Sequence, residues 1–295
     1  MSISDIVVGV DGSAESDAAL RWAALEAQRH GATLTVLHAH EPGDYGIRTP
    51  LEEAHVQDMR RIAAAIVDSA VTEVRSLAPA VRVQGETVGG GAAAGLIRAA
   101  DPGTMVVVGN RGRGGFAGLL LGSVSQHVAA HARGSVVIVR DGAGRPDGPV
   151  VVGVDEANES DHTLGVAFEE AALRGAPIQV LHTYVLAIQT WGLDLPPEVE
   201  DEHVRQTAEA NRLAAIVAPW REKFPAVPVE AFAVEGQASA RLVDASSTAQ
   251  LVVVGSRGGG GFAGLLLGSV SLHLLHHADC PVLITRDAAR SGRAA

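Results

Sequence analysis

The residues from 109 to 125 read GNRGRGGFAGLLLGSVS, and nearly the same segment returns at 255–271 as GSRGGGGFAGLLLGSVS. Only two of these seventeen positions differ, because Asn110 becomes Ser256 and Arg113 becomes Gly259. The two copies lie 146 residues apart, which is much longer than the unit of a solenoid built from short repeats. The repeat therefore indicates that a whole globular domain is duplicated within the chain.

Two further segments return at a similar distance. The sequence VVGVD at 7–11 returns at 151–155, and VLH at 36–38 returns at 180–182, each 144 residues later. Between the copies, the segment GAGRPDGP at 142–149 is rich in glycine and proline, which is typical of a linker. We therefore predict a first domain at 1–141, a linker at 142–148 and a second domain at 149–295.

Each half alternates short β-branched runs with longer segments that are apolar at helical spacing. In the first half this pattern predicts strands at 5–10, 33–39, 81–88, 105–109 and 135–139, and helices at 14–29, 51–77, 92–100 and 122–131. The second half follows the same pattern from 150 to 284. Strand and helix in alternation predict an α/β fold, in which each domain is a doubly wound parallel sheet with helices on both faces.

Composition excludes several classes of protein. The hydrophobic content of 47% is enough for a large core, and no apolar run approaches the ~18 residues that a membrane span needs. The start of the chain has neither a basic segment nor a long apolar one, so we expect no signal peptide. The single cysteine, Cys280, cannot form an internal disulfide or a cysteine metal cluster. The net charge of −11 argues against a nucleic-acid surface. From the cysteine usage, the missing signal peptide and the short apolar runs, we expect a cytoplasmic protein without membrane partners.

The glycine-rich repeat carries the strongest chemical signal. A strand that ends at Gly109 is followed by a loop whose backbone N–H groups can approach an anion closely. The helix that begins at Gly122-Ser123 adds unpaired N–H groups, a favourable dipole and a hydroxyl donor. Together these features predict a cradle for a polyphosphate. The alternative is a tight connection in which the glycines serve only the turns.

The cradle is predicted from two sets of equivalent residues. In the first half they are Gly109, Asn110, Arg111, Gly112, Arg113, Gly114, Gly115, Gly122, Ser123, Val124 and Ser125, and in the second half Gly255, Ser256, Arg257, Gly258, Gly259, Gly260, Gly261, Gly268, Ser269, Val270 and Ser271.

These segments resemble the universal stress protein family in its tandem form. VGVDGS at 8–13, LHA at 37–39 and the spacing of glycines 109, 112 and 122 before Ser123 match the family, the last being its ATP-binding signature. The resemblance implies strand order 3-2-1-4-5 in each five-stranded sheet and bound ATP with Mg²⁺. It also implies that the domains pair through their fifth strands, 136–139 and 282–285, and that the chain forms a homodimer.

In that strand order the first and fourth strands meet at a topological switch point, where open α/β sheets bind ligands. The resemblance implies that Asp11, at the end of the first strand, contacts the nucleotide or its metal, and that Ala39 contacts adenine through its main chain. A capping role for Asp11 at the following helix is the alternative. The remaining residues implied near the nucleotide are Gly9, Val10 and Gly90 and, in the second half, Gly153, Asp155 and Thr183.

The second half departs from the family pattern after its first strand. Gly12-Ser13 follows Asp11, whereas Glu156-Ala157 follows Asp155. An extra carboxylate and a lost hydroxyl predict that the second site binds nucleotide more weakly. For the histidines, we predict packing roles for His38 and His182. The pair His273 and His277 lacks a visible third ligand, so we predict no metal site.

The leading hypothesis for function is an ATP-binding regulatory protein of stress adaptation, in which bound ATP biases a conformational or oligomeric switch. We predict no catalytic residue, because no nucleophile–base pair accompanies the loops. The only lysine is Lys223, and no Gly-Lys-Ser/Thr motif is present, which excludes a P-loop enzyme. The alternative is a slow ATPase or ATP-dependent enzyme that uses Asp11 and Mg²⁺. A flavin carrier is disfavoured, because DGS at 11–13 is not a hydroxyl-rich phosphate loop.

Overall fold

The structure is a computed structural model and describes residues 3–40, 50–114, 120–140, 144–155, 160–184, 202–257 and 266–286. The elements of the first half are β1 (Asp5–Gly9), α1 (Ala14–His30), β2 (Thr33–His40), α2 (Pro50–Leu77), β3 (Val83–Gly89), α3 (Ala92–Ala99), β4 (Thr104–Gly109), α4 (Ser123–His131) and β5 (Ser135–Val139). Those of the second half are β6 (Val150–Val154), α5 (Ser160–Arg174), β7 (Ile178–Tyr184), α6 (Glu202–Lys223), β8 (Val229–Glu235), α7 (Ala238–Ser246), β9 (Leu251–Gly255), α8 (Ser269–His277) and β10 (Val282–Thr285).

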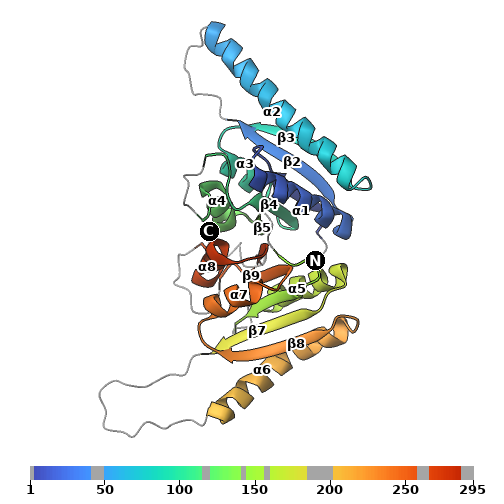
Figure 1. Cartoon of the computed structure of the whole chain (residues 1–295), viewed down its shortest axis with the longest axis vertical. Helices are drawn as coiled ribbons and strands as arrows, with labels where there is room; N and C mark the ends of the chain where they lie inside the picture. Colours follow the sequence, from blue (N-terminus) through green and yellow to red (C-terminus); the bar gives the residue numbers. More distant parts are fainter. Residues whose placement is uncertain are drawn as a thin grey trace, which may run out of the picture.

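All strands of the described residues belong to one ten-stranded sheet with the order β3-β2-β1-β4-β5-β10-β9-β6-β7-β8. Each half therefore has the order 3-2-1-4-5, and its strands pair in parallel. The two halves meet at β5 and β10, which pair antiparallel with Val137 opposite Leu283. Figure 1 shows the result as an elongated molecule with α2 and α6 at its two ends. The predicted α/β fold class is confirmed.

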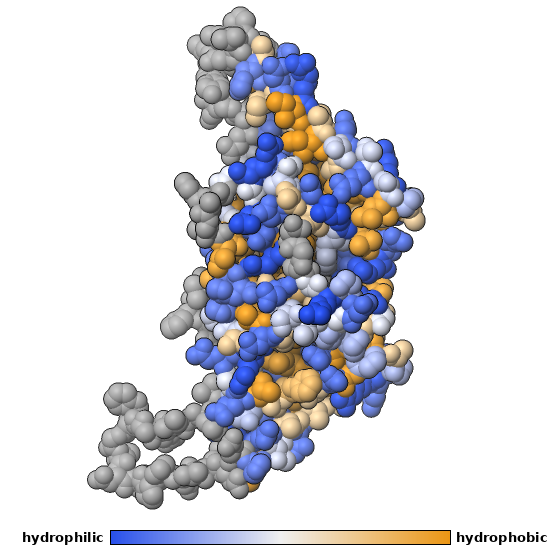
Figure 2. Space-filling view, in the orientation of Figure 1, coloured by the Kyte–Doolittle hydropathy of each residue, from blue (hydrophilic) through white to orange (hydrophobic). Residues whose placement is uncertain are grey.

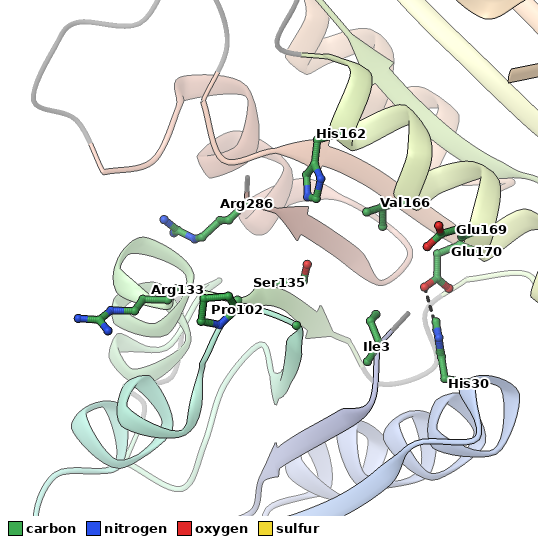
Figure 3. A pocket seen from close by; sticks show the side chains of 12 residues that line it. Ile3, His30, Pro102, Arg133, Ser135, His162, Val166, Glu169, Glu170 and Arg286 are labelled. Atoms are coloured by element: carbon green, nitrogen blue, oxygen red, sulfur yellow. Dashed lines mark hydrogen bonds and ion pairs between the residues drawn. The ribbon is translucent and has the colours of Figure 1, made fainter. Parts of the chain in front are cut away.

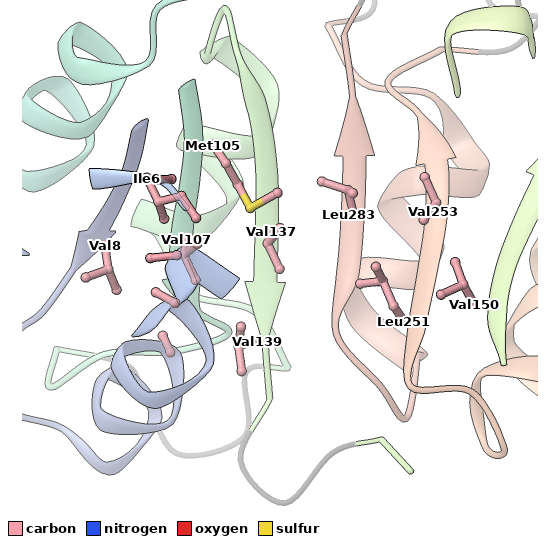
Figure 4. Packing of buried hydrophobic residues seen from close by; sticks show 14 of the residues in the cluster. Ile6, Val8, Met105, Val107, Val137, Val139, Val150, Leu251, Val253 and Leu283 are labelled. Carbon is pink, nitrogen blue, oxygen red and sulfur yellow. The ribbon is translucent and has the colours of Figure 1, made fainter. Parts of the chain in front are cut away.

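Hydrophobic cores cover both faces of this sheet and cross the junction between the halves. One core places α1, α2, α5 and α6 over the sheet through residues such as Leu20, Val67 and Phe168. The other places α3, α4, α7 and α8 over the opposite face through residues such as Leu96 and Leu274. Figure 4 shows buried side chains on both sides of the β5–β10 junction. Apolar packing therefore joins the halves in addition to the strand pairing.

The predicted elements of the first half agree with the observed ones to within two residues at each end. Local signals explain this agreement for α1. Ser13 caps its N-terminus by accepting a hydrogen bond from the Ser16 amide at 3.2 Å. At the other end the chain leaves the helix through Gly31, whose φ of 63° lies in the left-handed region that favours glycine. The helix thus ends at His30, one residue later than the sequence predicts.

The described part of the predicted linker packs against the second half. The Gly144 amide donates to the Asp279 carbonyl at 2.8 Å, and the Arg145 amide donates to the Ala249 carbonyl at 3.0 Å. A Cβ at Gly148 would collide with the Thr248 carbonyl, so the chain needs glycine there. From residue 144 onward the connection is therefore held in one position on the second half.

A buried cluster of charged side chains joins α1 to α5. Arg174 donates to both Glu26 (2.8 Å) and Glu170 (3.0 Å), and His30 lies 3.0 Å from Glu170 and 3.3 Å from Glu26. The two carboxylate side chains are 0% and 1% exposed. Figure 3 shows His30 and Glu170 facing each other beside a cavity of about 20 Å³ between the halves. The cluster therefore places paired charges inside the junction.

Ionisation in this cluster differs from that of the free side chains. Burial alone would lower the pKa of His30, but hydrogen bonds and charge attraction from Glu170 and Glu26 outweigh it and raise that pKa to about 9. Burial, together with the neighbouring Glu26 carboxylate, raises the pKa of Glu170 to about 7. His30 is consequently a cation at neutral pH.

The visible surface is mostly hydrophilic, with separate hydrophobic patches (Figure 2). Among the described helices, none is both long and apolar enough to cross a membrane.

Candidate functional site

The carboxyl ends of β1 and β4 bring Asp11 and the glycine-rich loop into contact. One oxygen of Asp11 accepts a hydrogen bond from the Arg113 amide at 2.7 Å. The other accepts from the Ser13 amide at 3.0 Å and from the Ser13 hydroxyl at 2.6 Å. Burial would raise the pKa of Asp11, but the bonds from Ser13 and Arg113 outweigh it and lower that pKa. Asp11 is therefore an anion that fastens the loop to the start of α1.

The start of α4 lies against the same loop. Gly122 is the N-cap of α4, and its amide donates to the Asn110 carbonyl at 2.7 Å. The geometry of a helix leaves the next amides, those of Ser123, Val124 and Ser125, without acceptors inside the helix. Ser123 is exposed at this end. Three backbone donors thus gather beside the loop, at the positive end of the helix dipole.

Asn110 adds a further unpaired polar atom. Its side chain is buried, and its Oδ1 atom has no hydrogen-bond partner among the described residues. The backbone N–H of Asn110 donates to the Val139 carbonyl at 2.8 Å, which ties the first residue of the loop to the end of β5. Buried polar atoms normally have partners. An orphaned oxygen beside unpaired amides fits a site that holds a polar ligand.

Glycine is required at two positions of the loop for close approach. A Cβ at Gly109 would lie 2.6 Å from the Glu15 carbonyl in the first turn of α1. A Cβ at Gly112 would collide with the Asp11 carboxylate. By contrast, a Cβ at Gly114 would meet no atom of the described residues within 4 Å. Gly109 and Gly112 therefore let the loop, α1 and Asp11 touch, as a compact cradle needs.

Two arginines of the loop lie at its rim. The Arg111 guanidinium pairs with Glu15 at 2.9 Å, and the Arg113 side chain donates to the Asp11 carbonyl at 3.4 Å. Both arginines are exposed, so they can turn toward an anion in the cradle. Sequence reasoning missed Glu15. Its only signal is an acidic residue in the first turn of α1, which usually serves the helix dipole rather than a loop.

The second half repeats the core of this arrangement. The Gly268 amide donates to the Ser256 carbonyl at 2.7 Å at the start of α8. Ser271 donates its hydroxyl to the Gly255 carbonyl at 2.7 Å, as Ser125 does to Gly109 at the same distance. These two hydroxyls therefore hold the helix to the strand. Predicted residues Gly115, Gly258, Gly259, Gly260 and Gly261, and the substituted pair Glu156-Ala157, lie outside the described residues.

The other predicted residues lie around the two cradles. Ala39 and Thr183 occupy equivalent places near the ends of β2 and β7. In the second half, residues of β7, β8, α6 and α7, among them Tyr184, line an open groove of about 370 Å³. Asp155 is exposed after β6, and Arg257 follows β9. The structure therefore places each of these residues at or just after the carboxyl end of a strand in its own half.

Two kinds of predicted residue, glycines at strands and valines at helix starts, also have packing roles. At Gly9 a Cβ would lie 3.0 Å from Leu96, and at Gly153 it would lie 2.8 Å from Leu242, so helices α3 and α7 approach the sheet there. Val124 and Val270 are partly buried against the hydrophobic core on that face.

The predicted packing of the histidines at the strand ends agrees with their contacts. The Nδ1 atom of His38 lies 2.6 Å from the Val10 carbonyl, and that of His182 lies 3.3 Å from the Val154 carbonyl. His273 and His277 have ring centroids 4.4 Å apart on α8. The described residues place no third ligand with that pair.

Comparisons with known proteins agree with this architecture. The model of the universal stress protein family matches residues 3–140 and 148–286. A universal stress protein of Mycolicibacterium smegmatis is 37% identical over 293 residues, which cover 95% of this chain and 96% of the relative. One from Mycobacterium tuberculosis is 37% identical over 296 residues, with the same coverage. A solved universal stress protein from Archaeoglobus fulgidus has a TM-score of 0.69 at 19% identity, over 97% of each chain, which is a likeness of fold. The chain belongs to the universal stress protein family and carries two of its domains in tandem.

Proposed function

We propose that the chain is a cytoplasmic ATP-binding regulatory protein of stress adaptation, with one nucleotide site in each of the domains at 1–141 and 149–295. Bound ATP favours the state of the protein in which the glycine-rich loop is ordered. It therefore acts by shifting either the conformation of the chain or its assembly into a homodimer. The observation that carries the proposal is the contact between the loop and the start of α4, with unpaired amides at its end, repeated at α8.

Each part of the site suits one part of ATP. The backbone amides of Ser123–Ser125 and the arginines of the loop suit the phosphates, because N–H groups at a helix N-terminus and guanidinium groups both donate hydrogen bonds to anions and attract negative charge. Main-chain groups near Ala39 suit adenine. The Asp11 carboxylate, ionised at neutral pH, suits Mg²⁺ or a ribose hydroxyl. Magnesium held there would neutralise phosphate charge.

A change of charge at Ser123 tests the site in the first domain. Ser123 is exposed at the first position of α4, where an acidic residue stabilises a helix. Ser123→Glu should therefore fold normally yet repel phosphate, whereas the neutral Ser123→Gln has the same length and should bind ATP. The equivalent variants in the second domain are Ser269→Glu and Ser269→Gln.

Calorimetric titration with MgATP should give two sites in the parent chain, one in each single Glu variant and none in the double Glu variant. ATP or ADP should also be released from the denatured purified protein and be identified by mass spectrometry. Two remaining sites in the double Glu variant would refute the proposed location. If the parent chain bound no ATP, the function itself would be refuted.

The enzymatic alternative has its own readout. A slow ATPase would release phosphate over many turnovers, and Asp11→Asn would abolish that release. For a regulatory protein, we expect one ATP per site to be retained through hours of incubation without sustained phosphate release.

A further inference from the structure

Two arginines cross the junction between the domains and contact helices on the opposite side. Arg286 follows β10 of the second domain, and its guanidinium donates to the carbonyls of Ala129 and Ala130, the latter at 2.9 Å. Arg140 follows β5 of the first domain and donates to the carbonyls of His276 and Leu275, the latter at 2.9 Å. The two arginines are 146 residues apart, as the two glycine-rich loops are. They form a reciprocal pair, which we name the crossed arginines.

The crossed arginines occupy a favourable place on each helix. The last carbonyls of a helix have no partner inside it and carry partial negative charge, so a cation there stabilises the helix end. Ala129 and Ala130 lie in the last turn of α4, and Leu275 and His276 lie in the last turn of α8. Both arginines are partly buried, and the Nη2 atom of each donates to two successive carbonyls at the helix end, which holds that end in place.

The same two helices form the proposed phosphate sites at their other ends. Each has nine residues and is therefore about 13 Å long. Phosphate binds at the amino end of α4, and Arg286 of the second domain holds its carboxyl end. In the second domain, α8 lies in the same way between its own cradle and Arg140. A shift of either helix end moves the amides at the other end, because so short a helix moves as a rigid body.

Each crossed arginine is also tied to the loop of its own domain. Arg140 comes directly after Val139, whose carbonyl accepts the Asn110 amide at 2.8 Å. Arg286 comes directly after Thr285, whose carbonyl accepts the Ser256 amide at 3.0 Å. Each crossed arginine therefore begins beside the cradle of its own domain, and its side chain contacts the helix that forms the cradle of the other domain.

We propose that Arg140 and Arg286 are positioning residues for nucleotide binding across the domain junction. Arg286 aims α4 for the site of the first domain, and Arg140 aims α8 for the site of the second. This inference rests on the proposed function, since it concerns the same two sites. It assigns to each site a residue of the other domain, which lies far in the sequence from the residues of that site.

The test is a crossed pattern of affinities in the full chain. Ser123→Glu leaves only the site of the second domain, and Ser269→Glu leaves only that of the first. In the Ser123→Glu background, Arg140→Gln should weaken MgATP binding about fivefold, while Arg286→Gln should have no effect. In the Ser269→Glu background, Arg286→Gln should weaken MgATP binding about fivefold, while Arg140→Gln should have no effect. Arg98→Gln, which removes an exposed charge from α3, is the matched control and should change neither affinity.

This pattern separates positioning from stability. A general loss of stability would weaken both sites with either variant, whereas positioning weakens only the site in the opposite domain. The variants Arg140→Lys and Arg286→Lys keep the charge at the helix end and should restore part of the affinity, and they serve if a Gln variant fails to fold. Equal effects on both sites, effects only on the site of the same domain, or no effect would each overturn the inference while leaving ATP binding intact. Absence of MgATP binding in the parent chain would overturn both proposals.

Discussion

Replacing His30 by glutamine removes one cation from the buried cluster between the domains. The imidazole side chain is 7% exposed and lies 3.0 Å from Glu170 and 3.3 Å from Glu26. These carboxylates raise the pKa of His30 from 6.5 to about 9. Glutamine keeps a hydrogen-bonding side chain at this place but cannot carry the charge. The variant therefore isolates the contribution of protonation to the stability of the chain.

The expected magnitude follows from the pKa shift. One pKa unit corresponds to ~1.36 kcal/mol, so the shift gives protonated His30 about 3 kcal/mol of stability. Because the pKa is raised in the folded chain, this stability is fully present below pH 6.5 and is lost as the pH rises from 6.5 to 9. Against the parent chain, His30→Gln should cost about 3 kcal/mol at pH 6 and almost nothing at pH 9.5.

The measurement is urea-induced unfolding followed by circular dichroism at pH 6, 7.5 and 9.5. His131→Gln, which replaces an exposed histidine on α4, is the control and should change the free energy of unfolding by less than about 0.5 kcal/mol at every pH. A cost of His30→Gln that stayed constant from pH 6 to pH 9.5 would refute the reasoning. A cost that grew with pH would show that the cluster prefers neutral His30.

Three further outcomes can be checked. Phe168→Ala should lower the free energy of unfolding by about 3–5 kcal/mol in urea titrations, because its ring is fully buried and packs against two other aromatic rings; a cost below 1 kcal/mol would contradict this. Gly109→Ala should cost about 1–3 kcal/mol in the same assay and weaken MgATP binding in calorimetry, because its Cβ would lie 2.6 Å from the Glu15 carbonyl; an unchanged affinity would contradict the second part. In the single-site variants, the first domain should bind MgATP about ten- to a hundredfold more tightly, because in the second domain Glu156-Ala157 replaces Gly12-Ser13 and Gly259 replaces Arg113; equal affinities would refute this.

Local sequence signals were sufficient to predict the elements, whereas the strand order was predicted from the resemblance to the family. Buried strands such as β4 are runs of valine bounded by glycine, and a short helix such as α4 begins directly after Gly122. These signals act over a few residues, so they can be seen in the sequence. The repeat supplied the domain organisation, because a second copy has to build the same sheet.

Contacts between side chains far apart in the chain could not be predicted in this way. Asp11 was expected to bind a ligand or to cap α1, yet it also accepts the Arg113 amide and so closes the loop. Glu26, on a helix surface, would be expected to face water, yet its side chain is fully buried because Arg174 of the other domain reaches it. Such contacts depend on how two elements approach each other, and no local pattern specifies that approach.

The buried cluster also gives a physical reason for joining the two domains in one chain. Glu26 and Glu170 are 144 residues apart, as are His30 and Arg174, so the cluster consists of two pairs of equivalent positions. A symmetric pair of identical domains would place either two histidines or two arginines beside the two carboxylates. The tandem chain places one of each, so that one cation stays charged at any physiological pH while the other loses its charge as the pH rises through about 9. Between the domains the junction therefore keeps one permanent ion pair, Arg174 with Glu26, and one that depends on pH, His30 with Glu170, a combination that identical halves could not provide.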